Sequence, residues 1–312
     1  MPIETHHDKV VISLTPPALA TPTTTGAVPA ACTIYLHGAT VTSWTVNGRE
    51  MLFLSSKAIL DGSKPIRGGI PLVFPQFGTY PGAPLPQHGF ARTTTWRILR
   101  TDISPDETKA TAVFVLTSAD LSHAALTAWP TPFRLEYTVT VDAVRHTLST
   151  DLAATNLATA GEFDMTFTWL LHTYLRVDAI EDTEIRGLEG RLYVNKAITD
   201  RDPATQAFLA LPITEETDRV YQNVVPAAES HLHVMSGGRP AVEIVRTHGE
   251  TAFRDVVVWN PWVDKAKAMA DFGDDEYRHM VCVEVGDVAM PNAVSVAPGE
   301  TRRAGQVLRA LL

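Results

Sequence analysis

The sequence predicts an all-β protein built as one large antiparallel β-sandwich with a few short helices. Short apolar segments of strand length recur along most of the chain, separated by turn-forming stretches such as Ser104-Pro-Asp-Glu. Helix candidates are restricted to residues 120–128 and 261–269. Strands and helices do not alternate, so a parallel α/β sheet is not expected.

Strand candidates begin near the N-terminus. An apolar segment covers residues 10–14, whereas Thr, Pro and Ala dominate residues 15–30. We therefore expect residues 1–30 to be a loosely ordered segment of a single domain that spans residues 1–312. Asn-Gly between apolar runs is a strong hairpin signal, and Asn47-Gly48 fits it. The strand candidates around this pair are residues 32–36, 40–46 and 51–54.

Residues 67–92 are predicted to form a long ordered loop. Five prolines in this stretch remove backbone donors and fix φ, which disfavours both a helix and a continuous strand. The stretch also contains two arginines, two glutamines and a histidine. Long ordered loops with such side chains are more often sites than connectors. A Pro-rich crossover with solvated arginines is the alternative interpretation.

Further strand candidates follow the loop at residues 94–100, 111–117, 133–141 and 146–154. Residues 163–175 are almost uniformly apolar or β-branched, which is typical of a central strand buried on both faces. His172 lies inside this strand. An unpaired buried polar group costs about 1–3 kcal/mol, so His172 must be hydrogen-bonded or face a cavity. A satisfied core histidine is the simpler interpretation.

Glu284 interrupts a second apolar strand candidate, residues 279–286. Strand alternation places Cys282, Glu284 and Gly286 on one face and the intervening valines on the other. Carboxylates are rarely buried alone, so Glu284 is expected to face a polar environment. A buried histidine and a buried glutamate on separate strands are suited to act as an acid/base pair.

Two other segments carry polar or aromatic groups that could contact a ligand. A third pattern, a pair of histidines, is a candidate metal site. Asp218-Arg-Val-Tyr221 is polar, and residues 256–262 end in Trp-Asn-Pro-Trp, whose aromatic faces either stack on a sugar or cap the core. His231 and His233 would share a strand face and could form half of a metal site, but no complete ligand set is apparent. Glycine-rich nucleotide signatures and the Gly-x-Ser-x-Gly elbow are absent.

Composition limits the possible partners and compartments. The net charge of −9 argues against nucleic acid, and no apolar run approaches the length of a membrane span. The N-terminal sequence lacks the pattern of a secretory signal. Cys32 and Cys282 both lie among apolar residues and are expected to be free, buried thiols of a reducing compartment. We therefore expect a cytoplasmic protein, with a monomer as the default state.

Six blocks of the sequence, taken in order, resemble a known family. They are Arg67-Gly-Gly-Ile-Pro-Leu-Val-Phe-Pro-Gln76, Gln87-His-Gly-Phe-Ala-Arg92, Leu171-His-Thr-Tyr174, Asp218-Arg-Val-Tyr221, Val258-Trp-Asn-Pro-Trp262 and Cys282-Val-Glu-Val-Gly286. Over about residues 30–310 the chain resembles the glucose-6-phosphate 1-epimerases (hexose-6-phosphate mutarotases) of the aldose 1-epimerase, galactose mutarotase-like superfamily. That family's antiparallel β-sandwich agrees with the strand pattern. Leu175 departs from it, since the family usually has Phe there, and is expected to reshape the pocket wall.

The resemblance implies the site residues. The catalytic histidine and glutamate of the family fall on His172 and Glu284. The family's substrate contacts fall on Arg67, Gln87, Arg92 and Asp218, and His88 is placed close to the sugar ring.

The implied reaction interconverts the α and β anomers of glucose 6-phosphate and related hexose 6-phosphates. Glu284, as a carboxylate, would take the proton of the C1 hydroxyl while His172, as an imidazolium, protonates the ring oxygen. The roles reverse on ring closure, and no metal, nucleotide or redox cofactor is needed. The planar donor forks of Arg67 and Arg92 match phosphate oxygens, which favours a phosphosugar as substrate.

Two other functions remain open from the sequence. An aldose 1-epimerase acting on free sugars would share the acid/base pair but would not need the arginines for phosphate. A non-catalytic sugar-phosphate-binding regulatory module would keep the arginines and Trp259 without needing His172 and Glu284. The presence of both in apolar strands favours an enzyme.

Overall fold

The computed structural model describes residues 2–15, 29–79, 84–198, 202–224, 231–249, 253–289 and 292–311. Within these residues the strands pair in antiparallel sheets, and the α-helices are limited to α1 (His123–Ala128) and α2 (Trp262–Ala268). The all-β class and the two short helices predicted from the sequence are confirmed. None of the described helices is long and apolar enough to cross a membrane.

A nine-stranded sheet forms the layer on which the rest of the molecule packs. Its strands are, in spatial order, β17 (Ala210–Pro212), β14 (Thr183–Arg186), β19 (Leu232–Ser236), β20 (Arg239–Thr247), β24 (Thr301–Ala310), β10 (Thr147–Asn156), β9 (Phe133–Asp142), β8 (Lys109–Thr117) and β7 (Arg97–Ile103). β9 buries every second side chain along most of its length, as expected of a strand with one face on the core.

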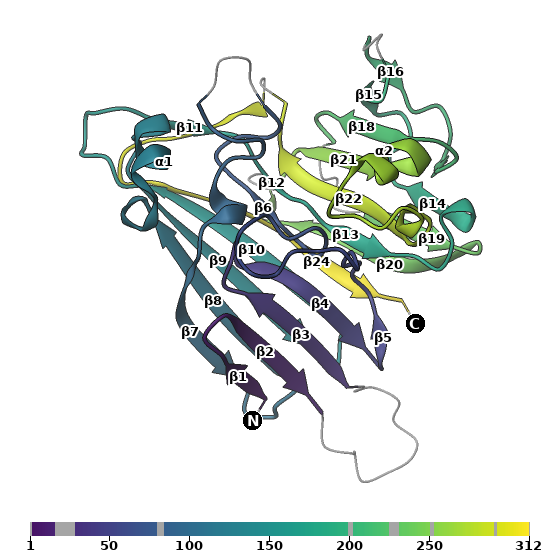
Figure 1. Cartoon of the computed structure of the whole chain (residues 1–312), viewed down its shortest axis with the longest axis horizontal. Helices are drawn as coiled ribbons and strands as arrows, with labels where there is room; N and C mark the ends of the chain where they lie inside the picture. Colours follow the sequence, from purple (N-terminus) through teal and green to yellow (C-terminus); the bar gives the residue numbers. More distant parts are fainter. Residues whose placement is uncertain are drawn as a thin grey trace.

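Two further sheets cover the two halves of this layer (Figure 1). The first has the order β1 (Ile3–Thr5), β2 (Lys9–Leu14), β3 (Ala30–Tyr35), β4 (Thr40–Val46) and β5 (Arg49–Glu50), and β2 and β3 contact β8 and β9. The second has the order β16 (Ala204–Thr205), β15 (Leu192–Asn195), β18 (Thr217–Tyr221), β21 (Asp255–Asn260), β22 (Met280–Asp287), β12 (Trp169–Leu171) and β6 (Leu72–Val73). One hydrophobic core joins all three sheets.

Several element boundaries differ from those expected. The Asn47-Gly48 hairpin is present, but β4 pairs with β5 rather than with residues 51–54. Residues 51–54 form only isolated bridges, from Leu52 to Leu175 and from Leu54 to Gly68. Within the N-terminal segment that was expected to be loose, residues 3–5 and 9–14 form β1 and β2, whereas residues 16–28 lie outside the described part of the chain.

The predicted continuous strand at residues 163–175 is wrong. The chain forms three short strands there, β11 (Met165–Phe167), β12 and β13 (Tyr174–Arg176), of which β11 pairs with β23 (Val294–Val296). The backbone amides at the two breaks bond to the proline-rich loop: Thr168 donates to the Pro75 carbonyl at 2.9 Å and His172 to the Pro71 carbonyl at 3.0 Å. His172 therefore sits at a corner between strands, not inside one.

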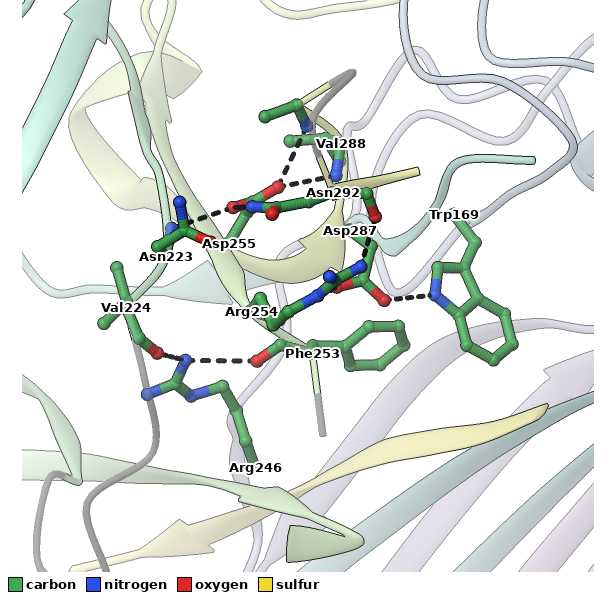
Figure 2. A network of polar contacts seen from close by, with 11 residues as sticks. Trp169, Asn223, Val224, Arg246, Phe253, Arg254, Asp255, Asp287, Val288 and Asn292 are labelled. Atoms are coloured by element: carbon green, nitrogen blue, oxygen red, sulfur yellow. Dashed lines mark hydrogen bonds and ion pairs between the residues drawn. The ribbon is translucent and has the colours of Figure 1, made fainter. Parts of the chain in front are cut away.

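A buried polar network ties the ends of β21 and β22 to neighbouring loops (Figure 2). The carboxylate of Asp255 accepts hydrogen bonds from the backbone amides of Asn223, Val288 and Ala289 and from the Asn292 side chain, at 2.6–3.1 Å. Asp287, three residues beyond Glu284, accepts from Arg254 at 2.8 Å and from the Trp169 indole at 2.8 Å. Both aspartates are fully buried, so this network fixes the strand that carries Glu284.

Candidate functional site

A row of paired residues across the second covering sheet, which β13 joins by pairing with β22, forms the floor of the candidate site. The register pairs Asp218 with Trp259, Trp259 with Cys282, and Cys282 with Tyr174 of β13. Residues opposite one another in a ladder point to the same face, so these four side chains share a face. The valines at 281, 283 and 285 lie in the main core on the other face, which confirms the alternation predicted for β22.

A cavity of about 290 Å³ lies on this face. Its size and its few convergent polar groups are those of a small-molecule site rather than a polymer cleft. The residues around it are Arg67, Phe77, Gly78, Gln87, His88, His172, Lys196, Asp218, Val257, Trp259, Lys265, Met269 and Glu284. Six of the seven residues that the sequence singled out therefore line one cavity. The seventh, Arg92, donates to the Gln87 carbonyl at 2.8 Å.

His172 and Glu284 face each other in the cavity wall. Nδ1 of His172 lies 3.5 Å from Oε2 of Glu284. The imidazole stacks on the Tyr174 ring, with centroids 4.8 Å apart and planes 11° apart. The two facing atoms are buried, and neither has a hydrogen-bond partner within the described residues. The pair is thus held in place by packing and by the strand corner rather than by hydrogen bonds from neighbouring groups.

Burial controls the protonation of this pair. Desolvation lowers the pKa of His172 well below its usual value, and the positive charges of Arg92 and Arg67 lower it further. Desolvation also raises the pKa of Glu284 well above its usual value, with Asp218 adding to the effect. The ligand-free site therefore favours a neutral imidazole beside a protonated carboxyl. The mechanism implied by the family resemblance has an imidazolium beside a carboxylate. Both arrangements hold one exchangeable proton between the two side chains, but here that proton is on Glu284 rather than on His172.

His88 is a neutral donor held in one tautomer. Its Nδ1 accepts a hydrogen bond from the Gly78 amide at 3.1 Å, so its proton resides on Nε2. Burial, and then the charges of Arg92 and Lys196, lower the pKa of His88 to about 3. The next residue, Gly89, packs its backbone on the Phe74 carbonyl, where a Cβ would lie 2.1 Å from the oxygen. Gly89 thus permits the close approach that brings His88 edge-on to His172, with centroids 5.7 Å apart.

The basic side chains of the site differ in whether a carboxylate already pairs with them. Arg67 pairs with Asp271 through Nε at 3.2 Å and donates to the Tyr174 hydroxyl at 3.2 Å. Lys265 lies 2.9 Å from Glu216 and 4.0 Å from Asp218. By contrast, the Lys196 ammonium lies over the Phe77 ring at 4.7 Å, and no described carboxylate is within ion-pair distance of it.

Arg92 lies next to the cavity as a second basic group with unused donors. Its Nε is buried without a hydrogen-bond partner in the described part of the chain. Burial lowers the pKa of Arg92 to about 10, so the guanidinium stays charged at neutral pH. Its charge acts on both His88 and His172, which places it within electrostatic reach of the acid/base pair.

Sequence reasoning missed Lys196, Lys265 and Asp271 as parts of this site. Lys196 follows β15 in a stretch without a recognisable motif, and only the ladder with β18 brings it beside Asp218, whose carbonyl accepts from its amide at 2.6 Å. The Trp259 side chain lines the cavity and also packs in a buried cluster with Phe53 and Tyr174, so both interpretations of that motif stay open. Leu175 belongs to the main core, not to the pocket wall.

In the described residues, a carboxylate from β20 lies beside His231 and His233. Glu243 lies opposite His233 in the ladder, 2.6 Å from Nδ1 of His231 and 3.8 Å from Nε2 of His233. Its second oxygen pairs with Arg309 at 2.6 Å. This cluster lies on the nine-stranded sheet rather than on the sheet that carries the cavity, and Arg309 already neutralises the carboxylate.

Comparison with known proteins agrees with the geometry. Residues 27–309 match the aldose 1-epimerase family. The chain belongs to this family. Two relatives carry the name "Putative glucose-6-phosphate 1-epimerase". The one from Cenchrus ciliaris is 37% identical over 302 residues, covering 95% of this chain and 86% of the relative. The one from Salmonella typhimurium is 32% identical over 251 residues, covering 80% of this chain and 77% of the relative.

Solved structures show the same fold as this aldose 1-epimerase family member. The crystal structure of a "putative mutarotase" from Salmonella typhimurium superposes with a TM-score of 0.78 at 26% identity, covering 98% of this chain and 92% of that one. A galactose 1-epimerase from Lactobacillus acidophilus superposes with a TM-score of 0.69 at 16% identity, covering 99% and 97% of the two chains. The predicted antiparallel sandwich of the galactose mutarotase type is therefore confirmed.

Proposed function

We propose that this member of the family interconverts the α and β anomers of glucose 6-phosphate and related hexose 6-phosphates. The observation that carries the proposal is the His172–Glu284 pair, buried and face to face at 3.5 Å in a cavity lined by several basic residues. The names of the relatives point to the same substrate.

Ring opening requires two coordinated proton transfers. One group removes the proton from the C1 hydroxyl, the C1–O5 bond breaks, and the other group gives a proton to O5, which leaves the open-chain aldehyde. Rotation about C1–C2 exposes the other face of C1, and the reverse transfers close the ring. Because His172 and Glu284 share one proton, one accepts while the other donates, and the pair is restored after closure.

The charge distribution of the pocket supports a phosphorylated sugar. The chain carries a net charge of −9, yet Arg67, Arg92, Lys196 and Lys265 gather at this one cavity. Arg67 and Lys265 are engaged by carboxylates, which suits them to orient ring hydroxyls. Arg92 and Lys196 keep donors for an anion, so they are the groups we assign to the phosphate. Gln87, His88 and Asp218 are assigned to the hydroxyls of the ring.

We also propose a cytoplasmic location and a monomeric state for this protein. Cys32 and Cys282 are free and buried, which suits a cytoplasmic protein in a reducing environment. A monomer remains the prediction, and light scattering on the purified chain tests it directly.

Anomer exchange measured by saturation-transfer NMR tests the function. The expected result is strong acceleration of exchange for glucose 6-phosphate and much weaker acceleration for glucose at equal concentration. Equal acceleration of the two would identify a free-sugar aldose 1-epimerase instead. Binding of glucose 6-phosphate without acceleration would identify the non-catalytic binding module.

A further inference from the structure

We propose that His172, Cys282 and Glu284 form a binding site for a thiophilic divalent cation, with Zn²⁺ as the fitting ion, and that the bound ion inhibits the enzyme. Each residue offers one ligand atom, and the three atoms lie within 4.8 Å of one another. A histidine nitrogen, a thiolate sulfur and a carboxylate oxygen are the ligand types that Zn²⁺ takes in proteins.

The sheet brings the three ligands together. Cys282 and Glu284 are two residues apart on β22, so their side chains point to the same face. Tyr174 pairs with Cys282 across the ladder, which places the preceding corner with His172 beside both. Tetrahedral zinc with bonds of about 2.0–2.3 Å has ligands about 3.3–3.8 Å apart, and the His172–Glu284 separation of 3.5 Å fits this spacing.

The hydrogen bonding of the ligand atoms gives an independent indication. Nδ1 of His172 and Oε2 of Glu284 are both buried and lack hydrogen-bond partners within the described residues. The two side chains are 9% and 1% exposed, so water replaces such bonds poorly. A cation between them would replace the proton of the pair and contact a lone pair of each atom at once.

The chemistry of the site selects the metal. Burial raises the pKa of both Cys282 and Glu284, so the ion must displace their two protons to solvent as it binds. The resulting thiolate and carboxylate cancel the two positive charges of the ion, so the exchange adds no net charge to the buried site. Sulfur and imidazole ligands favour Zn²⁺ over Mg²⁺ and Ca²⁺, which prefer oxygen. His172 and Glu284 line the cavity, so it provides both an entry path and a fourth ligand position. Cys282 is fully buried and is not among the residues around the cavity.

Inhibition follows from the proposed function, whereas binding does not depend on it. A metal bound to Nδ1 and to the carboxylate occupies the lone pairs that ring opening needs for proton transfer. The ion would therefore lower the exchange rate without unfolding the protein. Removing the ion with a chelator would restore the rate.

The binding test uses Co²⁺ as a spectroscopic substitute for Zn²⁺ on the full chain. We expect one Co²⁺ per chain with a thiolate-to-cobalt charge-transfer band, displaced by stoichiometric Zn²⁺. Cys282→Ser should abolish the band and weaken Zn²⁺ binding by more than about tenfold, since even outer-shell changes cost about 10–100-fold. Cys32→Ser is the matched control, because Cys32 is the other free buried thiol, on β3, and the band should persist. A missing band in wild type, or an unchanged band in Cys282→Ser, would overturn the proposal.

The activity test separates this proposal from the function on which inhibition rests. Zn²⁺ should slow glucose 6-phosphate anomer exchange in wild type and Cys32→Ser, reversibly with EDTA. Each variant is compared with its own rate without zinc, and Cys282→Ser should resist the ion. Cobalt binding in a chain without exchange activity would reject the epimerase function and leave the metal site standing. Normal exchange that Zn²⁺ does not slow would reject the inhibitory site and leave the function standing.

Discussion

At the scale of single residues, the geometry separates the basic side chains that already pair with a carboxylate from those that do not. Lys196 lies over Phe77 without a carboxylate partner among the described residues, whereas Arg67 and Lys265 are already paired. Charge-assisted hydrogen bonds contribute about 1.5–3 kcal/mol, or about 10–100-fold in binding. We therefore expect position, rather than charge alone, to decide which cation binds the phosphate.

Lys196→Met should raise KM for glucose 6-phosphate by about 10–100-fold while leaving KM for glucose nearly unchanged, because only the phosphate loses a partner. Arg92→Ala should act in the same direction. Lys267→Met, on the exposed side of α2, is the control and should change neither value. Equal effects of Lys196→Met on both substrates would reject its assignment to the phosphate.

The protonation of the acid/base pair predicts a broad pH profile. The active pair carries one proton; it gains a second at the pKa of His172 and loses the last at the pKa of Glu284. Burial lowers the pKa of His172 well below 6.5 and raises the pKa of Glu284 well above 4.5. The acidic limb of kcat should therefore lie below pH 6.5. Measured kcat, unlike KM, is insensitive to phosphate titration of the free substrate. A half-maximal kcat near pH 6.5 would contradict the buried pair.

Single residues were the part of the site that the sequence predicted best. Six of the seven residues singled out line one cavity. They could be found in the sequence because their motifs are local and chemically distinctive. Lys196 and Asp271 escaped prediction because nothing in their neighbourhoods marks them, and only folding brings them to the pocket and to Arg67. The expected charge states also changed, since the extent of burial is a property of the fold.

At the scale of elements, the network at the ends of β21 and β22 stabilises the strand that carries Glu284. Asp255 is fully buried and accepts bonds from three backbone amides and one side-chain amide. Asp255→Ala should lower the free energy of unfolding by about 3–5 kcal/mol, because buried donors are left unsatisfied. Asp106→Ala, in an exposed turn, is the control and should have little effect. Denaturant unfolding of the two variants measures the difference, and equal stabilities would contradict the role of the network.

Element prediction succeeded where the strand pattern alone determines the structure and failed where another segment intervenes. β22 and the Asn47-Gly48 turn follow directly from alternation and turn chemistry. Residues 163–175 read as one strand, but Pro71 and Pro75 accept the amides at its breaks. That competition comes from a loop about ninety residues away, so local periodicity could not reveal it.

At the scale of the whole molecule, the corner that carries His172 depends on contact between layers. Gln306 of β24, in the nine-stranded sheet, donates to the Thr173 hydroxyl at 2.8 Å, next to His172 in the covering sheet. Both residues are fully buried. The sequence predicted the sandwich class, but not that one large sheet is covered by two smaller ones, because strand order is set by long-range pairing.

Gln306→Leu should lower kcat about tenfold with little change in KM, because His172 loses its support while the substrate contacts remain. The free energy of unfolding should fall by about 1–2 kcal/mol for the lost buried bond. Thr173→Val and the double variant complete a cycle, in which the two effects on kcat should not add. Additive effects would show that the interlayer bond does not position His172.

The most direct test of the proposed reaction is saturation-transfer NMR of glucose 6-phosphate anomers with wild type, His172→Gln and Glu284→Gln. Circular dichroism first establishes that each variant is folded. Rapid exchange in wild type should fall by about 10²–10⁴-fold in each variant, since each removes one proton-transfer group. Undiminished exchange in either folded variant, or no acceleration by wild type, would contradict the assignment of this buried pair as the catalytic acid and base.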